Sequence, residues 1–475
     1  MSNNVNQQVE REVVFGIVPV LPRERKYNFP DAFLVLSGYC IATWSYTQGS
    51  YLAGLVGFQQ LLIGAFFAAI LLLAIYQLPT ILSVRYGIDV WVWLKSVFGP
   101  RGVQIMTVTI IAINFPWYAV CADLFASSMA NLAGVFGLQL PAITHAPLGI
   151  ASVVVGTFIA YKGIGAITWT TRILVPLLLV LGLVVIYVGV TSVPTDVVWN
   201  YRPKVPANPD RMASYLLSIE ANFAFVITLV GGMAGVPRLT RKENAGFWSG
   251  VFGQGLSGSL FVVVGAVMAI AMQHATGKMV DDPTLMLATL AGPALALCSL
   301  LLVAFANIGT QAVGSYLYAV MLKSSFKKAD YRVLILILAA YVAALCAWGE
   351  ITKHFGTFLT ISACVYAPLA ALLLVDFFFV RGQKLALRSA FGLPGHHAYD
   401  YTAGINWVGF FCVAAGIAMS LSIYNPLTGQ IHCKALFYLT PTGFSFLGTG
   451  LLYFAMSKIP PIRSYLLRDR SEITV

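Results

Sequence analysis

Long apolar runs separated by short polar segments repeat along nearly the whole chain. A helix needs about 20 apolar residues to cross the roughly 30 Å hydrocarbon core of a bilayer. We therefore predict twelve membrane-spanning helices, near residues 33–56, 59–83, 103–135, 147–166, 170–192, 214–236, 246–273, 288–322, 332–349, 356–380, 404–424 and 436–457. The pattern indicates an all-α integral membrane protein with one membrane domain at 31–458, in which spans 1–10 occupy about 31–381 and spans 11–12 about 404–457, between tails at 1–30 and 459–475.

Polar residues within span 8 fall on one helical face. They follow the spacing i, i+3, i+4, i+7, i+8 and i+11, and they are Asn307, Thr310, Gln311, Gly314, Ser315 and Tyr318. This spacing places them in one stripe along a helix. Lipid offers no hydrogen-bond partner to such groups, so we expect the stripe to face protein or a bound ligand.

Spans 1 and 6 contain residues that weaken a continuous helix. Span 1 includes the polar stretch "SGYCIATWSYTQGS", and in span 6 Gly231, Gly232 and Gly235 come just before Pro237, which makes helix costly there. The two interruptions lie five spans apart, as two inverted five-helix repeats would place them. Broken helices at corresponding positions of two halves point to the central site of a transporter. The repeat is inferred from position alone, because the halves share no visible sequence similarity.

Composition and charge support a membrane protein. The chain is 59% hydrophobic and only 10% charged, whereas a soluble domain has about 25% charged residues. If the N-terminal tail is cytoplasmic, all but six of the 29 Lys and Arg residues fall in cytoplasmic segments, the six being Arg202, Lys204, Arg211, Lys278, Lys353 and Lys434. The positive-inside rule then predicts that both termini are cytoplasmic. It also explains the net charge of +11 without a nucleic-acid partner.

Residues with catalytic potential are scattered. Single cysteines occur at positions 40, 121, 298, 346, 364, 412 and 433, and histidines at 145, 274, 354, 396, 397 and 432. These spacings predict neither a disulfide framework nor a metal-binding motif. A phosphate-binding glycine loop and a nucleophile elbow are also missing from the sequence. We therefore do not expect an enzyme.

Four stretches resemble the nucleobase:cation symporter-1 family, the permeases for purines, cytosine, allantoin and hydantoin. They are "YKGIGAITWTTRILVPLLLV" at 161–180, "GVPRLTRKE" at 235–243, "LTISACVYAPLAALLLVDFFFVR" at 359–381 and "GINWVGFF" at 404–411. They correspond to family features of spans 5, 6, 10 and 11. The resemblance covers most of the chain from span 1 onward and depends on the order and spacing of all four.

The resemblance implies a leucine-transporter-like fold, with ten core helices in two inverted repeats plus two peripheral helices. It places the substrate between spans 1, 3, 6 and 8. It also implies a sodium site at Gly38 and Ile41 in span 1 and at Asn307, Thr310 and Gln311 in span 8. Sodium is a hard cation that takes oxygen ligands, which the stripe of span 8 supplies. Sodium-coupled members resemble one another in having Thr where this chain has Gln311, so proton coupling stays open.

The same resemblance implies a wall for a planar substrate. Trp117 matches the span 3 aromatic on which the family stacks a heterocycle, and aromatic faces bind π systems. The other candidates for this wall are Asn114, Cys121, Ala42, Phe225, Val226, Gln311 and Tyr316. The alternative for Trp117 is an ordinary core or interfacial tryptophan.

Three carboxylates lie within predicted spans. Asp376 precedes Arg381 in span 10, and we expect the two to pair structurally. Asp123 in span 3 and Glu220 in span 6 are candidates for proton coupling, because a carboxylate at membrane depth is costly and is by default functional. The alternative is that Asp123 and Glu220 are solvated by an outer vestibule, which would explain their positions equally well.

We thus expect a symporter that imports a nucleobase or related small planar nitrogen heterocycle by alternating access, coupled to Na⁺ or H⁺. No cofactor beyond a coupling Na⁺ is expected. The expected location is the plasma membrane, and the expected form is a monomer with a small-molecule substrate and no nucleic acid. Two alternatives remain, an amino-acid or polyamine transporter of the same architecture and a membrane sensor that has lost transport. A channel is disfavoured, because no charged ring or repeated filter sequence appears.

Overall fold

The structure is a computed structural model that describes residues 18–467, except 41–42, 163, 205–209, 229–234 and 281. Within these residues, seven helical segments are long and apolar enough to cross a membrane: Phe58–Tyr76, Pro100–Val135, Ala142–Tyr161, Glu243–Thr276, Pro293–Ser325, Tyr331–Trp348 and Phe355–Val380. Two shorter apolar helices are Pro176–Ser192 and Trp407–Ile423. The expected all-α membrane architecture is confirmed, whereas the count of twelve spans stays a prediction.

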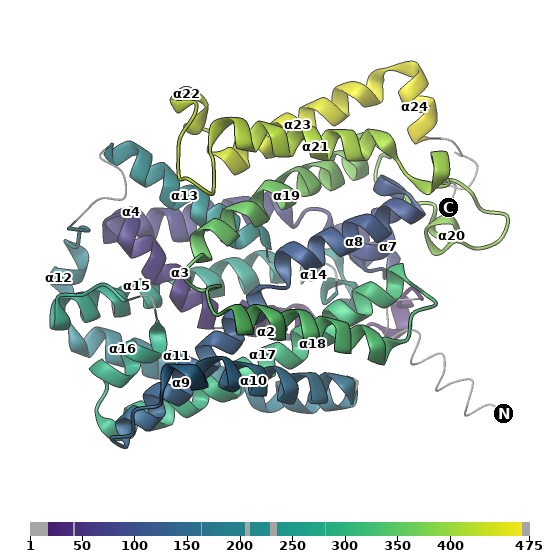
Figure 1. The fold of residues 1–475 in the computed structure, drawn as a ribbon. Helices are drawn as coiled ribbons and strands as arrows, with labels where there is room; N and C mark the ends of the chain where they lie inside the picture. Colours follow the sequence, from purple (N-terminus) through teal and green to yellow (C-terminus); the bar gives the residue numbers. More distant parts are fainter. Residues whose placement is uncertain are drawn as a thin grey trace, which may run out of the picture.

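The first half of the core runs from α2 to α11 (Figure 1). Its elements are α2 (Phe29–Cys40), α3 (Thr43–Leu55), α4 (Phe58–Leu62), η2 (Ile63–Ala68), α5 (Ala69–Tyr76), α6 (Thr80–Tyr86), α7 (Val90–Phe98), α8 (Pro100–Asn114), α9 (Trp117–Val135), η3 (Ala142–Thr144), α10 (His145–Tyr161) and α11 (Ile164–Ser192). A short 3₁₀ turn, η1 (Pro22–Glu24), precedes them. Predicted span 1 therefore corresponds to α2 and α3, and predicted span 3 to α8 and α9.

The second half of the core runs from α12 to η7. Its elements are α12 (Thr195–Trp199), α13 (Arg211–Ile227), η5 (Pro237–Leu239), α14 (Glu243–Gly250), η6 (Val251–Leu256), α15 (Ser257–Thr276), α16 (Pro283–Leu290), α17 (Pro293–Ser325), α18 (Tyr331–Trp348), α19 (Phe355–Val375) and η7 (Asp376–Val380). The stripe of span 8 lies on α17, the longest of these helices.

Helix geometry changes at matching places in the two halves. In the first span, α2 ends at Cys40 and α3 begins at Thr43, and residues 41–42 lie outside the described part of the chain. In the sixth span, α13 ends at Ile227, and residues 229–234 lie outside the described part before η5 begins. Gly231 and Gly232 lie outside the described residues. A π-helical turn, η2, divides the second span, and another, η6, divides the seventh, five spans later. Such turns often mark functional segments, and their positions agree with an inverted repeat.

Glycines allow helices of the two halves to approach closely. A Cβ on Gly253 would lie 3.0 Å from the Phe33 carbonyl oxygen of α2, and one on Gly265 would lie 2.2 Å from the Tyr46 carbonyl oxygen of α3. Gly253 and Gly265 thus pack as small residues do between membrane helices.

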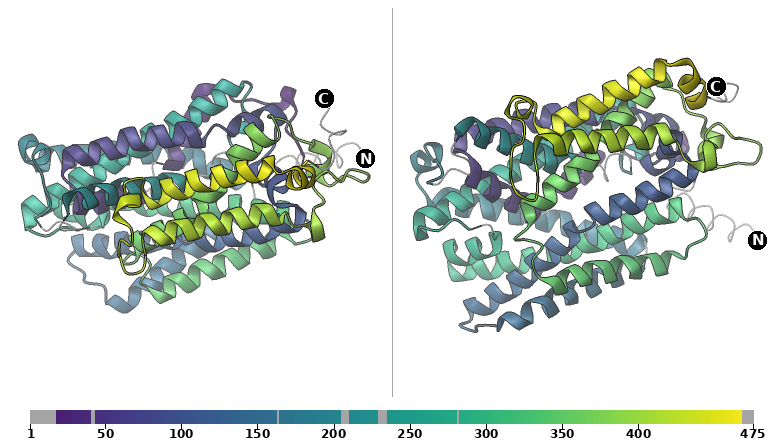
Figure 2. Two further views of the ribbon diagram at one scale, coloured as in Figure 1. Left: turned by 90° about the horizontal axis from the view of Figure 1, so that it is seen from above. Right: turned by 45° about the horizontal axis from the view of Figure 1, so that its top comes forward.

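Two peripheral helices, α21 (Trp407–Ile423) and α23 (Pro441–Lys458), lie side by side along one edge of the bundle (Figures 1 and 2). The remaining short elements are α20 (Leu387–Phe391), η8 (Thr402–Gly404), α22 (Lys434–Phe437) and α24 (Pro460–Leu466). Figure 1 shows α20 and α24 at one end of the bundle and α12, α16 and α22 at the other.

A buried ionic network joins α19 to the peripheral pair. The Arg381 guanidinium donates to Asp376 Oδ2 at 2.7 Å, and the Tyr453 hydroxyl of α23 donates to Asp376 Oδ1 at 2.8 Å. Arg381 also donates to the Ser96 carbonyl oxygen and the Tyr401 hydroxyl. The predicted pairing of Asp376 with Arg381 is confirmed. A buried charge that loses its partner is strongly destabilising, so this network holds α19, α7 and α23 in one arrangement.

Candidate functional site

Aromatic rings from three helices enclose Trp117. The chain turns at Phe115 and Pro116, so that α8 ends and α9 begins with Trp117, which is only 5% exposed. Its ring meets four others edge-on, with centroid distances of 5.5 Å to Trp44 of α3, 5.8 Å to Phe225 of α13, and 5.5 and 5.0 Å to Phe355 and Phe358 of α19. These five residues are called the aromatic cage below. They bring the third span together with both interrupted spans.

Two polar atoms, one on Trp117 and one on the last residue of α8, lack partners among the described residues. Trp117 Nε1 and Asn114 Oδ1 are buried and make no hydrogen bond within that part of the chain. The Asn114 amide nitrogen donates to the Tyr318 hydroxyl of α17 and, at 3.5 Å, to the Thr228 carbonyl oxygen where α13 ends. An orphaned buried polar group is costly, and one donor and one acceptor beside aromatic rings suit a planar polar ligand.

The stripe of α17 meets the first span at the start of α3. Thr43, the first residue of α3, donates its hydroxyl to Asn307 Oδ1 at 2.6 Å, and Asn307 donates to the Val303 carbonyl oxygen at 3.0 Å. Ser45 of α3 donates to the Cys40 carbonyl oxygen at the end of α2, at 2.6 Å. The ends of α2 and α3 and the facing part of α17 therefore carry hydroxyl, carbonyl and amide oxygens, the ligand type of a hard cation. Gly38 lies in α2, and Ile41 and Ala42 lie outside the described residues.

The remaining stripe residues point to different neighbours. Thr310 is partly exposed, and Gln311 is buried with its Oε1 unpartnered within the described chain. A Cβ on Gly156 of α10 would lie 2.7 Å from Gln311 Cγ, so Gln311 packs against α10. A Cβ on Gly314 would overlap the Tyr118 ring of α9. The stripe thus faces protein, as its spacing predicted.

Other predicted wall residues lie at different places. Cys121 and Val226 are buried on α9 and α13. Tyr316 packs its ring against Tyr331 of α18, at a centroid distance of 6.2 Å. Phe225 joins the aromatic cage, whereas Tyr316 makes no ring contact with the cage among the described residues.

The two candidate carboxylates differ in surroundings. Asp123 accepts a hydrogen bond from His145 Nε2 of α10 at 2.8 Å and another from the Thr352 hydroxyl, and its side chain is 20% exposed. Glu220 is 2% exposed, and its two oxygens accept from the Thr442 backbone N–H at 3.0 Å and hydroxyl at 2.6 Å. Thr442 lies in the first turn of α23, where a negative charge is favourable. Glu220 thus contacts a peripheral helix.

A second buried ionic contact lies after the sixth span. Asp89, which precedes α7, has its Oδ2 4.0 Å from Arg238 Nη1 in η5. Burial raises the pKa of the Asp89 carboxyl above its usual range, and the Arg238 charge opposes part of that rise. The contact joins the segment that follows the sixth-span interruption to α7.

Comparison with known proteins identifies the family. The family model described as permease for cytosine/purines, uracil, thiamine, allantoin matches residues 19–440. The chain belongs to this family. The permease is 24% identical over 359 residues to the hydantoin permease of Microbacterium maritypicum, covering 71% of this chain and 70% of that protein. It is 20% identical over 464 residues to the purine-uracil permease NCS1 of Arabidopsis thaliana, covering 92% and 74%.

Solved structures show the same fold. Mhp1, a nucleobase-cation-symport-1 family transporter, in a closed conformation with bromovinylhydantoin bound, matches the permease with a TM-score of 0.74 and 16% identity over 96% of this chain and 97% of that one. A Na⁺-coupled sialic acid symporter matches with a TM-score of 0.62 and 10% identity over 93% and 92%. The expected family and leucine-transporter-like fold are confirmed, and the permease is a multi-pass membrane transporter.

Several residues of the candidate site escaped the sequence analysis. Trp44 and Thr43 lie in the polar stretch of span 1, and their position in that stretch was the signal that could have identified them. Phe355 and Phe358 open α19 within an ordinary apolar pattern, so only the three-dimensional arrangement reveals their contact with Trp117.

Proposed function

We propose that the permease is a secondary active symporter that imports a nucleobase or a related planar nitrogen heterocycle by alternating access, coupled to Na⁺ or H⁺. The aromatic cage around Trp117, bordered by unpartnered polar atoms, is the observation that carries this proposal. The relatives support it, because their names refer to hydantoin, purine and uracil.

Recognition of the heterocycle follows from the chemistry of the cage. Aromatic faces bind π systems whatever the order of their ring atoms, so the cage selects flat ligands as a class. Trp117 Nε1–H can donate to a ring carbonyl, and Asn114 Oδ1 can accept from a ring N–H. Such a donor–acceptor pair is found along the edge of nucleobases and hydantoins. Substrate binding would thus satisfy two polar atoms that otherwise lack partners among the described residues.

We assign coupling to the region where α2 ends and α3 begins. Thr43 and Asn307 bring oxygen atoms of α3 and α17 together there, and Thr310 lies one turn further along α17. We propose that Na⁺ binds among these oxygens, with Gly38, Ile41 and Gln311 completing the candidate set. Coupling to H⁺ instead would involve Asp123 or Glu220.

The proposal includes the setting of the protein. The single transport domain at 31–458 would lie in the plasma membrane as a monomer. The end that carries α20 and α24 would face the cytoplasm, as the distribution of Lys and Arg predicts.

The test is uptake by the purified permease in proteoliposomes. Purines, pyrimidines, hydantoin, allantoin and vitamin-like rings are offered with Na⁺ and H⁺ gradients imposed separately. We expect accumulation of at least one planar heterocycle, driven by one of the two gradients. Accumulation of amino acids or polyamines alone would show that the substrate belongs to one of those classes and is not a heterocycle. Heterocycle binding without accumulation under either gradient would indicate a sensor.

A further inference from the structure

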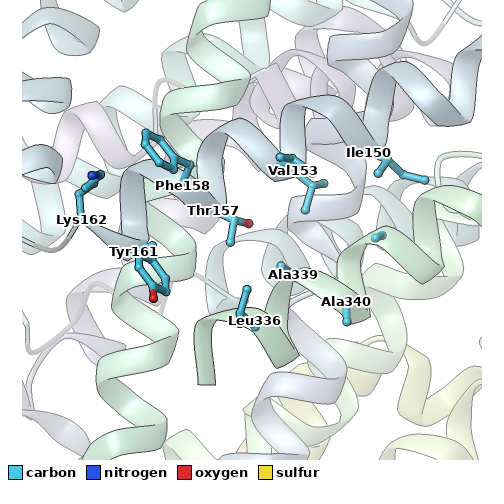
Figure 3. Close-up of a pocket in the computed structure, with 11 residues that line it drawn as sticks. Ile150, Val153, Thr157, Phe158, Tyr161, Lys162, Leu336, Ala339 and Ala340 are labelled. Carbon is cyan, nitrogen blue, oxygen red and sulfur yellow. The ribbon is translucent and has the colours of Figure 1, made fainter. Parts of the chain in front are cut away.

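A mainly apolar groove runs between α10 and α18, outside the site described above (Figure 3). It encloses about 480 Å³ and is lined by Ile150, Val153, Val154, Thr157, Phe158, Tyr161 and Lys162 on the α10 side and by Leu336, Ala339, Ala340 and Ala343 on the α18 side. The spacing of three or four residues places each set on one helical face. The groove therefore follows the two helix axes.

The groove has the shape and polarity of a site for a hydrocarbon chain. From Ile150 to Tyr161 it extends about 17 Å at 1.5 Å per residue, which is about one leaflet of the roughly 30 Å hydrocarbon core. Alanines on α18 leave room, while Val154, Phe158 and Leu336 are 62%, 61% and 55% exposed at its sides. Both helices are only 28% buried over their apolar windows, so the groove opens toward lipid.

Two cations lie at one end of the groove. Lys162 directly follows α10, with its Nζ 5.0 Å from the centroid of the Phe158 ring, and Arg332 of α18 lies with its Cζ 4.8 Å from the centroid of the Tyr161 ring. Both side chains are exposed. Neither forms an ion pair with an acidic residue in the part of the chain that the structure describes. Asp330 is the acidic residue nearest to Arg332 in the sequence. Its Oδ1 accepts hydrogen bonds from the backbone N–H groups of Arg332 and Val333.

We propose that this groove binds an anionic phospholipid, with one acyl chain along α10 and α18 and the headgroup phosphate at Lys162 and Arg332. The two rings hold the cations at the mouth of the groove by cation–π contact, at the depth where a headgroup begins. An apolar slot that ends in two unpaired positive charges complements a phospholipid of negative net charge. Basic residues near a membrane surface attract anionic lipid. The inference does not depend on which substrate the permease transports.

Native mass spectrometry of the full chain tests the proposal, with phosphatidylglycerol and phosphatidylcholine of identical acyl chains as probes. We expect phosphatidylglycerol to remain bound at lower lipid concentration than phosphatidylcholine. The double variant Lys162→Ala/Arg332→Ala should lose about 25-fold in phosphatidylglycerol affinity, on the basis of about fivefold for each cation. Ala340→Trp, which fills the groove, should weaken binding of both lipids.

Lys458→Ala is the matched control, because Lys458 also lies over an aromatic ring, with its Nζ 4.5 Å from the Phe454 centroid of α23. It should leave lipid binding unchanged. Equal retention of the two lipids by the wild-type chain, or an equal loss in Lys458→Ala, would overturn the proposal. A disulfide between two copies through Ala340→Cys, at native lipid content, would also overturn it, because a second copy of the chain would then cover the groove. The double variant changes only exposed side chains, so we expect its fold to be unchanged. Thermal unfolding checks this expectation.

Discussion

At the scale of single residues, Trp117 is held from several sides at once. Its edge-on neighbours come from α3, α13 and α19, so its ring is fixed by elements that belong to both halves of the core. A rigid ring loses little entropy on binding a ligand. This arrangement suits Trp117 to position a substrate.

We therefore expect Trp117→Ala to weaken heterocycle binding about 5- to 150-fold, since stacking on an aromatic ring contributes about 1–3 kcal/mol for nucleobases. Ligand-induced quenching or calorimetric titration of the purified protein measures this loss. The control is Trp407→Ala, because Trp407 is 58% exposed at the start of α21. Unchanged affinity in a folded Trp117→Ala protein would remove the stacking role.

The candidate carboxylates lead to a second prediction. Asp123→Asn keeps the size of the side chain and removes the charge that faces His145, so a proton-coupled permease should lose accumulation driven by a pH gradient. Glu220→Gln removes one acceptor from Thr442, and hydrogen bonds to charged groups are worth about 1.5–3 kcal/mol, so this variant should unfold at lower temperature. Uptake under a pH gradient and thermal unfolding are measured for both. Full pH-driven accumulation in both variants would exclude the two acids from coupling.

Sequence could predict residue types at the site more easily than their contacts. The polar stripe of α17 was readable because it contrasts with an apolar surrounding, and Trp117 was identified from the family resemblance. The partners of Trp117 were not, because Phe355 and Phe358 differ in no way from lipid-facing phenylalanines in the one-dimensional pattern. The pairing of Glu220 with Thr442 joins residues 222 positions apart, and no local pattern encodes such a contact.

At the scale of elements, close contact between α3 and α15 depends on glycine. Gly265 faces the Tyr46 backbone, and Gly49 faces the Val262 backbone, where a Cβ would lie 1.9 Å from the carbonyl oxygen. Backbone atoms cannot turn aside as side chains can, so any larger residue separates the two helices.

We expect Gly265→Ala to lower the thermal stability of the permease, with a cost at or above the roughly 1–3 kcal/mol of an overpacked core. Gly134→Ala on α9 is the matched control, because a Cβ there meets no atom within 4 Å and alanine favours helix by about 1 kcal/mol. Thermal unfolding in detergent compares the two. Equal stability would show that α3 and α15 are not packed as closely as described.

The contact between α3 and α17 gives the prediction for the coupling ion. Thr43→Val, Asn307→Ala and Thr310→Ala each remove an oxygen from the candidate ion site, and we expect each to raise the half-saturating sodium concentration of uptake about tenfold or more. Ile308→Ala is the control on α17. Uptake against external sodium at fixed pH measures the effect.

Lower transport with unchanged sodium dependence would point to proton coupling. An equal effect from Ile308→Ala would mean that the stripe only packs.

At the scale of the whole molecule, the distribution of charge predicts orientation. Cys433, which precedes α22, should react with a membrane-impermeant maleimide from outside intact cells in a Cys298→Ser background. A cysteine introduced as Ser464→Cys on α24, at the opposite end of the bundle, should react only after permeabilisation. Labelling is read by mass shift on a gel. The reverse pattern would invert the predicted topology.

The architecture was predictable from sequence because bilayer thickness fixes helix length and the interrupted spans recur five spans apart. The boundaries of the helices were less predictable. The sequence pattern predicted one span at 288–322, whereas the structure ends α16 at Leu290 and begins α17 at Pro293. Apolarity alone does not separate a short helix at the bundle end from the spanning helix that follows it.

The contact between Glu220 and α23 has a consequence for biosynthesis. The Glu220 carboxylate enters the membrane with α13. The Thr442 N–H and hydroxyl that donate hydrogen bonds to it are synthesised more than two hundred residues later. Until then a charge at membrane depth has no partner on α23, which is costly. Span 6 therefore reaches its final environment only when the C-terminal helices arrive, and a ribosome that stops before α23 leaves a nascent chain suited to capture by membrane chaperones.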